Sequence, residues 1–370
     1  MDANPIHARL VARSIEVIRG GQAATGAYLA SPTFPTYQYS WFRDGAFIAD
    51  AMSRVGETDS AEAFFGWCAG ILTDRRDQVL DLVARGERGV EDVALTDHLH
   101  TRYTTDGAES PVEWENFQLD GYGTWLWALG EHRARYGADL APYLAGAELT
   151  VAYLCAFWSS PFYDWWEENG DLRHPSSLAA IRAGLLAAAS WPELPSALRD
   201  RATTTAEDIR EFVLREAVVD GHLVKHLGST EVDASLVACV TPFRLVEPEG
   251  PIATATVERV RRELAPGGVY RFLADTFYGG GEWVLLAAFL GWHDAEAGDR
   301  DAALARLDWI AEQADADLEL PEQVADRALF PDRIDEWVER WGPSARPLLW
   351  SHAMYLTLAH ELGLTPQRTR

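Results

Sequence analysis

The two helical patterns that decide the fold lie in residues 176–215, which read SSLAAIRAGLLAAASWPELPSALRDRATTTAEDIREFVLR. Over 176–189 and again over 199–215, apolar residues recur about every 3.6 residues, the period of an α-helix. The segment between them is short and contains proline and tryptophan. Helices separated by loops of this kind pack as antiparallel hairpins, so this stretch predicts one hairpin.

The same helical period recurs along the rest of the chain, whereas the two-residue alternation of a β-strand is scarce. Nearly a dozen helices would form roughly six hairpins, which suggests an all-α fold of hairpins repeated around a common axis. No linker, low-complexity segment or solenoid-type repeat marks an internal boundary, so we expect a single domain over residues 1–370. The remaining helices are expected at residues 5–19, 44–55, 59–72, 119–135, 145–157, 254–264, 281–291, 299–314 and 347–361.

The composition is typical of a soluble protein that avoids polyanions. The formal net charge is −25 and Lys225 is the only lysine, so the surface would repel nucleic acid and anionic lipid. No stretch approaches about 18 uninterrupted apolar residues, and charges interrupt the N-terminal helix, so we expect neither a membrane span nor a secretory signal. The three cysteines, Cys68, Cys155 and Cys239, lie far apart and are expected to be reduced thiols. These features predict a cytoplasmic location.

Aromatic and charged residues gather in four of the longer loops. The chain has 15 tryptophans and 12 tyrosines. Their flat rings suit the faces of sugars, although a large core also buries many of them. Ordered loops often hold binding and catalytic residues. The candidate loops are residues 31–44, 100–118, 158–176 and 315–347.

The first cluster is PTYQYSWFRDGAF, residues 35–47, which places Tyr37, Trp41, Arg43 and Asp44 before an apolar helix. Two structural interpretations are open: Asp44 caps the helix, or it forms a salt bridge with Arg43. In the functional interpretation, the arginine offers donors and the aspartate acceptors to adjacent sugar hydroxyls, while a ring packs on the sugar.

Another cluster is SSPFYDWWEENGDLRHPSS, residues 159–177, in which Glu167 and Glu168 follow Trp165 and Trp166. The two glutamates are either solvated in a surface turn or candidates for acid catalysis. In the second case, desolvation by the tryptophans and repulsion by the neighbouring charge would raise the pKa of one carboxyl group. A general acid that works at neutral pH needs such a shift.

Three further segments offer single candidates. Trp114 precedes a helix and is expected to face a ligand or to pack structurally. Arg271 precedes three glycines at 279–281, which favour a close backbone approach to a pocket over a phosphate cradle. Glu322 follows Pro321 in a loop, and Trp350 lies at the start of the last expected helix. Glu322 is also open to a structural interpretation, because a glutamate after proline is common in the first turn of a helix.

Metal and cofactor chemistry finds little support. His98 and His100 could share one face of a strand, and His222 and His226 one face of a helix, but neither pair has an evident third ligand. No G-x-S-x-G motif and no Cys-His arrangement stands out. We expect no metal and no cofactor.

Seven motifs, taken in order, resemble the glucoamylase family of glycoside hydrolases, family 15. They run from about residue 30 to 361 and read YSWFRD, ENFQLDGYG, YDWWEE, VDAS, GVYRF with its downstream aspartate, LPEQ and LLWSHA. The resemblance implies an (α/α)6 barrel, in agreement with the helix count, with a pocket at one end. Many bacterial relatives carry an N-terminal β-sandwich domain for which this chain has no residues, so we expect the catalytic barrel alone.

The resemblance also implies roles for individual residues. Glu167 matches the general acid of the family and Glu322 matches its general base. Residues that match holders of the terminal glucose hydroxyls are Arg43, Asp44 and Arg271. Residues that match the lining of the same subsite or its neighbour are Tyr37, Trp41, Trp114, Glu168 and Trp350, and Trp166 is added to these substrate-binding candidates.

The implied reaction is inverting, exo-acting hydrolysis of an α-glucoside. Glu167 would protonate the glycosidic oxygen while Glu322 deprotonates a water on the opposite face of the sugar, and such pairs lie about 6.5–9.5 Å apart. Because neither an export signal nor a starch-binding extension is evident, we expect a short substrate, isomaltose or a related α-1,6-linked oligosaccharide, with glucose as product. The alternatives are α-1,4 glucoamylase activity, trehalase activity and a non-catalytic sugar-binding barrel.

Overall fold

The computed structural model describes residues 5–89 and 93–366, and helices dominate it. All eleven helices expected from the sequence are present, so the all-α prediction is confirmed. Two helices, α4 and α12, fall outside the predicted set. The helices in the described residues are α1 (Pro5–Gly20), α2 (Phe42–Arg54), α3 (Thr58–Asp74), α4 (Arg76–Arg88), α5 (Asp120–Tyr136), α6 (Leu144–Phe157), α7 (Pro175–Ala189), α8 (Ser196–Glu216), α9 (Pro251–Leu264), α10 (Val284–Glu296), α11 (Arg300–Glu312), α12 (Ile334–Trp341) and α13 (Leu349–Glu361).

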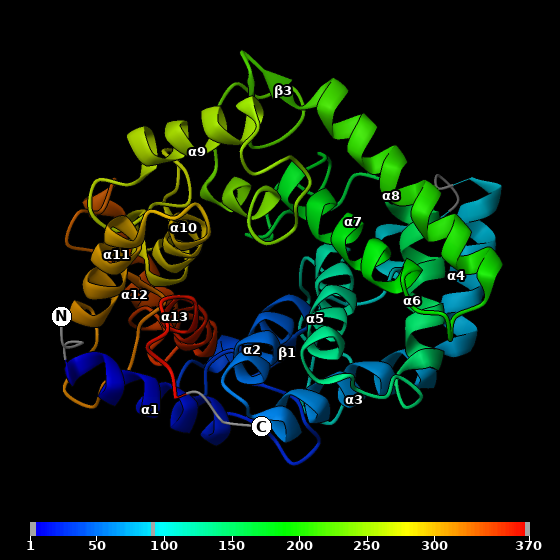
Figure 1. Ribbon diagram of the computed structural model, residues 1–370, viewed down its shortest axis with the longest axis horizontal. Coiled ribbons are helices and arrows are strands. Elements are labelled where there is room, and N and C mark those ends of the chain that lie inside the picture. The colour runs from blue at the N-terminus through cyan, green and yellow to red at the C-terminus, as the bar shows by residue number, and fades with distance from the viewer. Residues whose placement is uncertain (1–4, 90–92, 367–370) are drawn as a thin grey trace.

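Five α-helices and one short 3₁₀ helix form the inner ring of an (α/α)6 barrel, as the resemblance implies. In chain order they are α2, α5, α7, the 3₁₀ helix η4 (Ala234–Cys239), α10 and α13; each packs against the next, and α13 closes the ring against α2. Figure 1 looks down the barrel and shows the outer helices around this ring. The outer helices α1, α3, α6, α8, α9 and α11 each pack against an inner partner.

The 3₁₀ helix η4 is the shortest element of the inner ring, and the sequence pattern does not predict it as a helix. η4 follows the VDAS motif, and its N-cap residue Asp233 accepts a hydrogen bond from the backbone N–H of Ser235 at 2.8 Å. All six residues of η4 are buried. A run this short that is buried throughout has no exposed polar face, so it lacks the periodicity that reveals the other helices.

The two unpredicted α-helices contribute little to the core. α4 buries only Val79, Leu82 and Val83, and α12 buries no residue at all. α12 has eight residues, and its Trp337 and Trp341 pack against Phe277. α12 is shorter than the window of about 11–18 residues over which periodicity is read, whereas α4 carries Val79, Leu82 and Val83 at helical spacing and could have been predicted.

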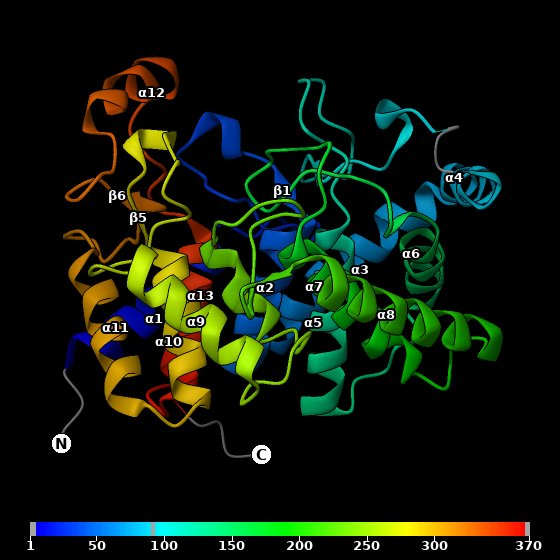
Figure 2. The ribbon, with the colours of Figure 1, turned by 90° about the horizontal axis from the view of Figure 1, so that it is seen from above.

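The described residues form three antiparallel pairs of two-residue strands, and two of these pairs connect loops that are far apart in the sequence. β1 (Ser40–Trp41) pairs with β2 (Arg102–Tyr103), and β5 (Glu282–Trp283) pairs with β6 (Gln323–Val324). The third pair is β3 (Val218–Val219) with β4 (His222–Leu223). The first two pairs bring loops that precede inner helices to the same side of the barrel, where Figure 2 shows β1, β5, β6 and α12.

Aromatic rings fill the centre of the barrel. Phe47, from α2, stacks on Trp350 at a ring distance of 5.5 Å and contacts Phe289 edge to face at 5.1 Å. Trp165 and Phe243 lie 5.9 Å from the same ring. Burial of so many large rings stabilises the ring of helices and closes the barrel interior beneath the loops.

The cysteine prediction is also confirmed, since Cys68, Cys155 and Cys239 are all free thiols. Among the described residues, no helix combines the length and the hydropathy needed to cross a membrane.

Candidate active site

A pocket of about 350 Å³ opens among the loops on one side of the barrel. Its walls come from segments that directly precede the inner helices, and Trp165 and Trp350 link it to the aromatic centre described above. Eleven residues were predicted from the sequence to bind or act on a substrate, and all eleven line this one pocket. They are Tyr37, Trp41, Arg43, Asp44, Trp114, Trp166, Glu167, Glu168, Arg271, Glu322 and Trp350.

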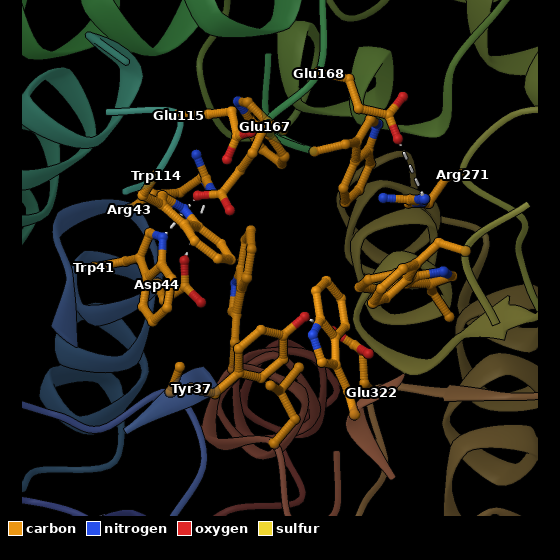
Figure 3. A pocket seen from close by; sticks show the side chains of 18 of the residues that line it. Tyr37, Trp41, Arg43, Asp44, Trp114, Glu115, Glu167, Glu168, Arg271 and Glu322 are labelled. Carbon is orange, nitrogen blue, oxygen red and sulfur yellow. Dashed lines mark hydrogen bonds and ion pairs between the residues drawn. The ribbon is translucent and has the colours of Figure 1, made fainter. Parts of the chain in front are cut away.

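Glu167 lies on a tight turn before α7, on one wall of the pocket (Figure 3). Its Oε1 accepts hydrogen bonds from the indole N–H of Trp41 at 2.7 Å and from Gln118 Nε2 at 3.1 Å. The guanidinium group of Arg43 lies 3.8 Å from the same oxygen. The backbone of Glu167 has φ of 65°, a region in which residues other than glycine are strained.

The expected crowding of the two adjacent glutamates does not occur. Glu168 turns toward the opposite wall, where its Oε1 lies 3.7 Å from Arg271 Nη2 (Figure 3). Burial raises the pKa of Glu168, and Arg271 acts against that shift. Glu167 instead faces two donors and a cation, because the turn directs consecutive side chains to different sides. The predicted repulsion between these two carboxylates is therefore wrong.

Glu322 lies across the pocket from Glu167, directly before β6 (Figure 3). It is 3% exposed, and its two oxygens accept hydrogen bonds from Tyr37 Oη at 2.9 Å and Ser344 Oγ at 3.4 Å. Burial raises the pKa of Glu322 to about 7, although the Tyr37 hydrogen bond and the charge of Arg271 both act to lower it. Burial first, and then the charge of Glu322, hold the pKa of Tyr37 well above its ordinary value, so its hydroxyl remains a donor.

Arg43 and Asp44 lie side by side at the start of α2, but Asp44 is not the cap of that helix. The N-cap position belongs to Trp41, so the capping interpretation is wrong. Arg43 donates to Gln118 at 2.8 Å and to Asp120 at 3.0 Å, and its Nε lies 3.7 Å from Asp44. Burial raises the pKa of Asp44 to about 7, with Arg43 acting in the opposite direction. The salt bridge and a place in the pocket therefore coexist.

The wall that carries Trp41 contains a buried arginine that the sequence analysis missed. The guanidinium carbon of Arg102 lies 3.6 Å from the Trp114 ring centre, 4.3 Å from Tyr39 and 5.2 Å from Trp41. Such cation–π contacts hold flat rings in place. Arg102 follows His98 and His100 in the sequence, and the β1–β2 pairing, which the sequence does not reveal, brings it to this wall.

A second set of pocket residues also escaped prediction. They come mainly from the α10 and α12 sides of the mouth, where Arg340 lies over the Trp341 ring at 4.7 Å. For Trp337 and Trp341, the available signal was the presence of aromatic residues in the 315–347 loop. The added lining residues include Glu115, Trp165, Phe277, Trp283, Trp337, Arg340 and Trp341. The glycines at 279–281 do not line the pocket: Gly279 lies against the backbone of Phe330, Gly280 against that of Asp275 and Gly281 against that of Val324, which corrects that expectation.

In the described part of the chain, no group of three or more histidine, cysteine, aspartate or glutamate side chains is arranged to hold a metal ion. The histidines considered above have other partners. His98 stacks on Phe117 at 3.5 Å and shares a hydrogen bond with the hydroxyl of Tyr153.

Comparison with known proteins agrees with this geometry. The sequence model of the glycosyl hydrolases family 15 matches residues 5–290. Isomaltose glucohydrolase of Kribbella flavida is 52% identical over 360 residues, which are 96% of this chain and 93% of that protein. Trehalase 1 of Sulfolobus acidocaldarius is 21% identical over 274 residues, 66% of this chain and 43% of that protein.

Solved structures show the same barrel. A glycosidase superposes with a TM-score of 0.95 at 50% identity, covering 99% of this chain and 100% of that one. A glutamate-to-alanine variant in complex with glucose has the same TM-score, identity and coverage. A bacterial glucoamylase complexed with acarbose has a TM-score of 0.77 at 19% identity, over 98% of this chain and 57% of that one, and shares the fold.

Proposed function

The chain belongs to glycosyl hydrolase family 15, and on that premise we propose that it hydrolyses short α-glucosides from their non-reducing end with inversion, releasing β-glucose. The chain is a glycoside hydrolase, and its proposed substrate is isomaltose or a related α-1,6-linked oligosaccharide. The single observation that supports the reaction best is the pair of carboxyl groups, Glu167 and Glu322, on facing walls of one pocket (Figure 3).

Glu167 is the proposed general acid. A sugar alkoxide leaves poorly, so the glycosidic oxygen must receive a proton as its bond to the anomeric carbon breaks. The two donors from Trp41 and Gln118 both bind Oε1. Neither donor binds Oε2, so this oxygen is the one placed to deliver the proton to the substrate. Trp41 and Gln118 would therefore fix the orientation of the carboxyl group relative to the substrate.

Glu322 is the proposed general base. It must be ionised to take a proton from the attacking water. The hydroxyls of Tyr37 and Ser344 donate to its two oxygens, and donation of this kind favours the carboxylate over the acid. Attack from the Glu322 side with departure toward the Glu167 side inverts the anomeric carbon.

The remaining candidates are proposed to hold the terminal glucose. Arg43 and Asp44 on one side and Arg271 on the other would offer donors and acceptors to its hydroxyls. Trp41 and Trp114 form an aromatic wall, and Trp165 and Trp350 close the bottom of the pocket. A pocket closed in this way admits only the end of a saccharide, which supports exo action.

A substrate panel tests the function. Identity of 52% to isomaltose glucohydrolase favours the α-1,6 linkage, so glucose release from isomaltose is expected to exceed release from maltose, trehalose and kojibiose in kcat/KM. A higher kcat/KM on trehalose or maltose than on isomaltose would contradict the proposed α-1,6 specificity. Saccharide binding by calorimetry without any glucose release would contradict catalysis altogether.

The pH profile is expected to report Glu322. Because its pKa is about 7 in the free protein and the base must be ionised, kcat/KM should fall as the pH drops through about 7. Tyr37→Phe removes a hydrogen bond that lowers this pKa, so the acid limb should move to higher pH by about one unit or more. Tyr39→Phe, in the same loop, is the matched control and should leave the limb in place. If the acid limb of kcat/KM in Tyr37→Phe is unchanged or moves to lower pH, the assignment of Glu322 as the general base is contradicted.

A further inference from the structure

Lys225 is the only lysine in a chain whose other cationic side chains are arginines, and it is buried. Its side chain is 6% exposed, and the ammonium group lies 3.4 Å from Asp233 Oδ2. The same group lies 2.9 Å from the centre of the Phe272 ring. Burial of a cation is costly unless a carboxylate compensates it, so this position requires a local explanation.

Two buried aspartates hold the turn that carries Glu167. Asp164 Oδ1 accepts the backbone N–H groups of Trp166 and Glu168, both at 2.9 Å. Asp233 Oδ2, the oxygen that faces Lys225, accepts the indole N–H of Trp166 at 2.9 Å. These three bonds fix the residues on either side of Glu167.

The turn needs such support because its backbone is strained. Glu167 has φ of 65° and Asn169 has φ of 55°, both in the left-handed region. Side chains other than glycine persist there only when their surroundings impose the conformation. Without the bonds to the aspartates, Glu167 would relax and lose its direction toward the pocket.

Lys225 is the cation that these aspartates share. The pKa of Asp164 is raised to about 6, chiefly by burial and also by the charge of Asp233, while the charge of Lys225 acts to lower it. Glu168 adds a negative charge on the same side, and burial lowers the pKa of His174 to about 4, so that histidine is neutral at pH 7. Arg271, the next cation, is bonded to Asp275. Removal of the ammonium group would leave buried carboxylates that repel each other.

We propose that Lys225 is a positioning residue for the general acid: its ammonium group pairs with the buried Asp233 beside Asp164, and these two aspartates hold the strained turn that directs Glu167 at the glycosidic oxygen. The proposal rests on the proposed role of Glu167. Lys225 does not line the pocket, so it acts through the turn and not on the substrate.

Lys225→Met tests this directly. Misplacement of a catalytic group by about 1 Å costs on the order of 100-fold, so kcat on isomaltose should fall by about that factor while KM changes less than about threefold. Lys225→Arg, which keeps the charge, should recover at least tenfold of that loss. Adding Asp233→Asn to Lys225→Met should cost much less than the product of the two single losses, because both act through one cluster. An Arg variant no better than Met, or fully multiplicative losses, would overturn the proposal.

The pH dependence separates positioning from general destabilisation. In Lys225→Met the pKa of Asp164 loses the influence that lowers it, so the acid limb of kcat should move to higher pH. A structural role alone would lower the amount of folded enzyme without moving the limb. Should the Met variant not fold, the wild type still offers a test, since lysine labelled with ¹³C at Cε gives one signal. That signal should shift with an inflection near pH 6 that Asp164→Asn abolishes, and a flat titration would contradict the proposal.

The two proposals fail in different ways. An active Glu167→Gln variant would remove the function of Glu167, whatever Lys225 does. An inactive Glu167→Gln variant together with wild-type kcat in Lys225→Met would remove only the role of Lys225.

Discussion

Glu167→Gln is expected to lower kcat on isomaltose by about 1,000-fold or more and to leave the fold intact. The amide cannot supply the proton that the departing sugar oxygen requires. It retains an oxygen that can accept the hydrogen bonds from Trp41 and Gln118, so the turn should keep its conformation. Steady-state kinetics and circular dichroism check the two parts of this prediction.

The nature of the leaving group sharpens the test of Glu167. An aryl glucoside such as 4-nitrophenyl α-glucoside carries a leaving group that needs little protonation, so the loss on that substrate should be much smaller than the loss on isomaltose. Glu115→Gln, which also removes a carboxylate from the pocket lining, should change kcat less than about tenfold. Equal losses on the two substrates would contradict the role of general acid.

Glu322→Gln is expected to lower kcat by a similar factor, about 1,000-fold, but equally on both substrates. Every substrate of an inverting enzyme needs an activated water, whatever its leaving group. The hydroxyl of Tyr37 can still donate to the amide oxygen, so the loss should reflect chemistry and not folding. Single-turnover kinetics on isomaltose and on the aryl glucoside would check it.

Glu319→Gln is the matched control for this segment. Its side chain lies three positions before Glu322 and bonds Arg13 at 2.9 Å outside the pocket. We expect a small effect on stability and near-normal kcat. A larger loss on isomaltose than on the aryl glucoside in Glu322→Gln would exchange the roles of the two glutamates.

The main architecture could be predicted because outer and inner helices bury one or more faces, and burial leaves a periodic apolar pattern. That pattern does not reveal η4 and α12, and the reason differs between them. η4 is buried on every side and only six residues long, and α12 buries nothing. η4 has no exposed face to contrast with a buried one, whereas α12 has an apolar face but is shorter than the window of about 11–18 residues over which periodicity is read.

The pocket could be predicted where short motifs stand next to inner helices, since those loops must meet at the same end of the barrel. Arg102 and Lys225 could not, because each depends on a partner far away in the sequence. Arg102 reaches the wall through pairing of β1 with β2, and Lys225 acts through Asp233. The different directions of Glu167 and Glu168 follow from a positive φ that the sequence WWEE does not reveal.

The configuration of the first product tests the central claim most directly. Proton NMR recorded within the first minutes of isomaltose hydrolysis resolves the α and β anomers of glucose before they equilibrate. Direct displacement by a water activated at Glu322 predicts that β-glucose appears first and that α-glucose follows only by mutarotation. Appearance of α-glucose first would contradict inversion by Glu167 and Glu322.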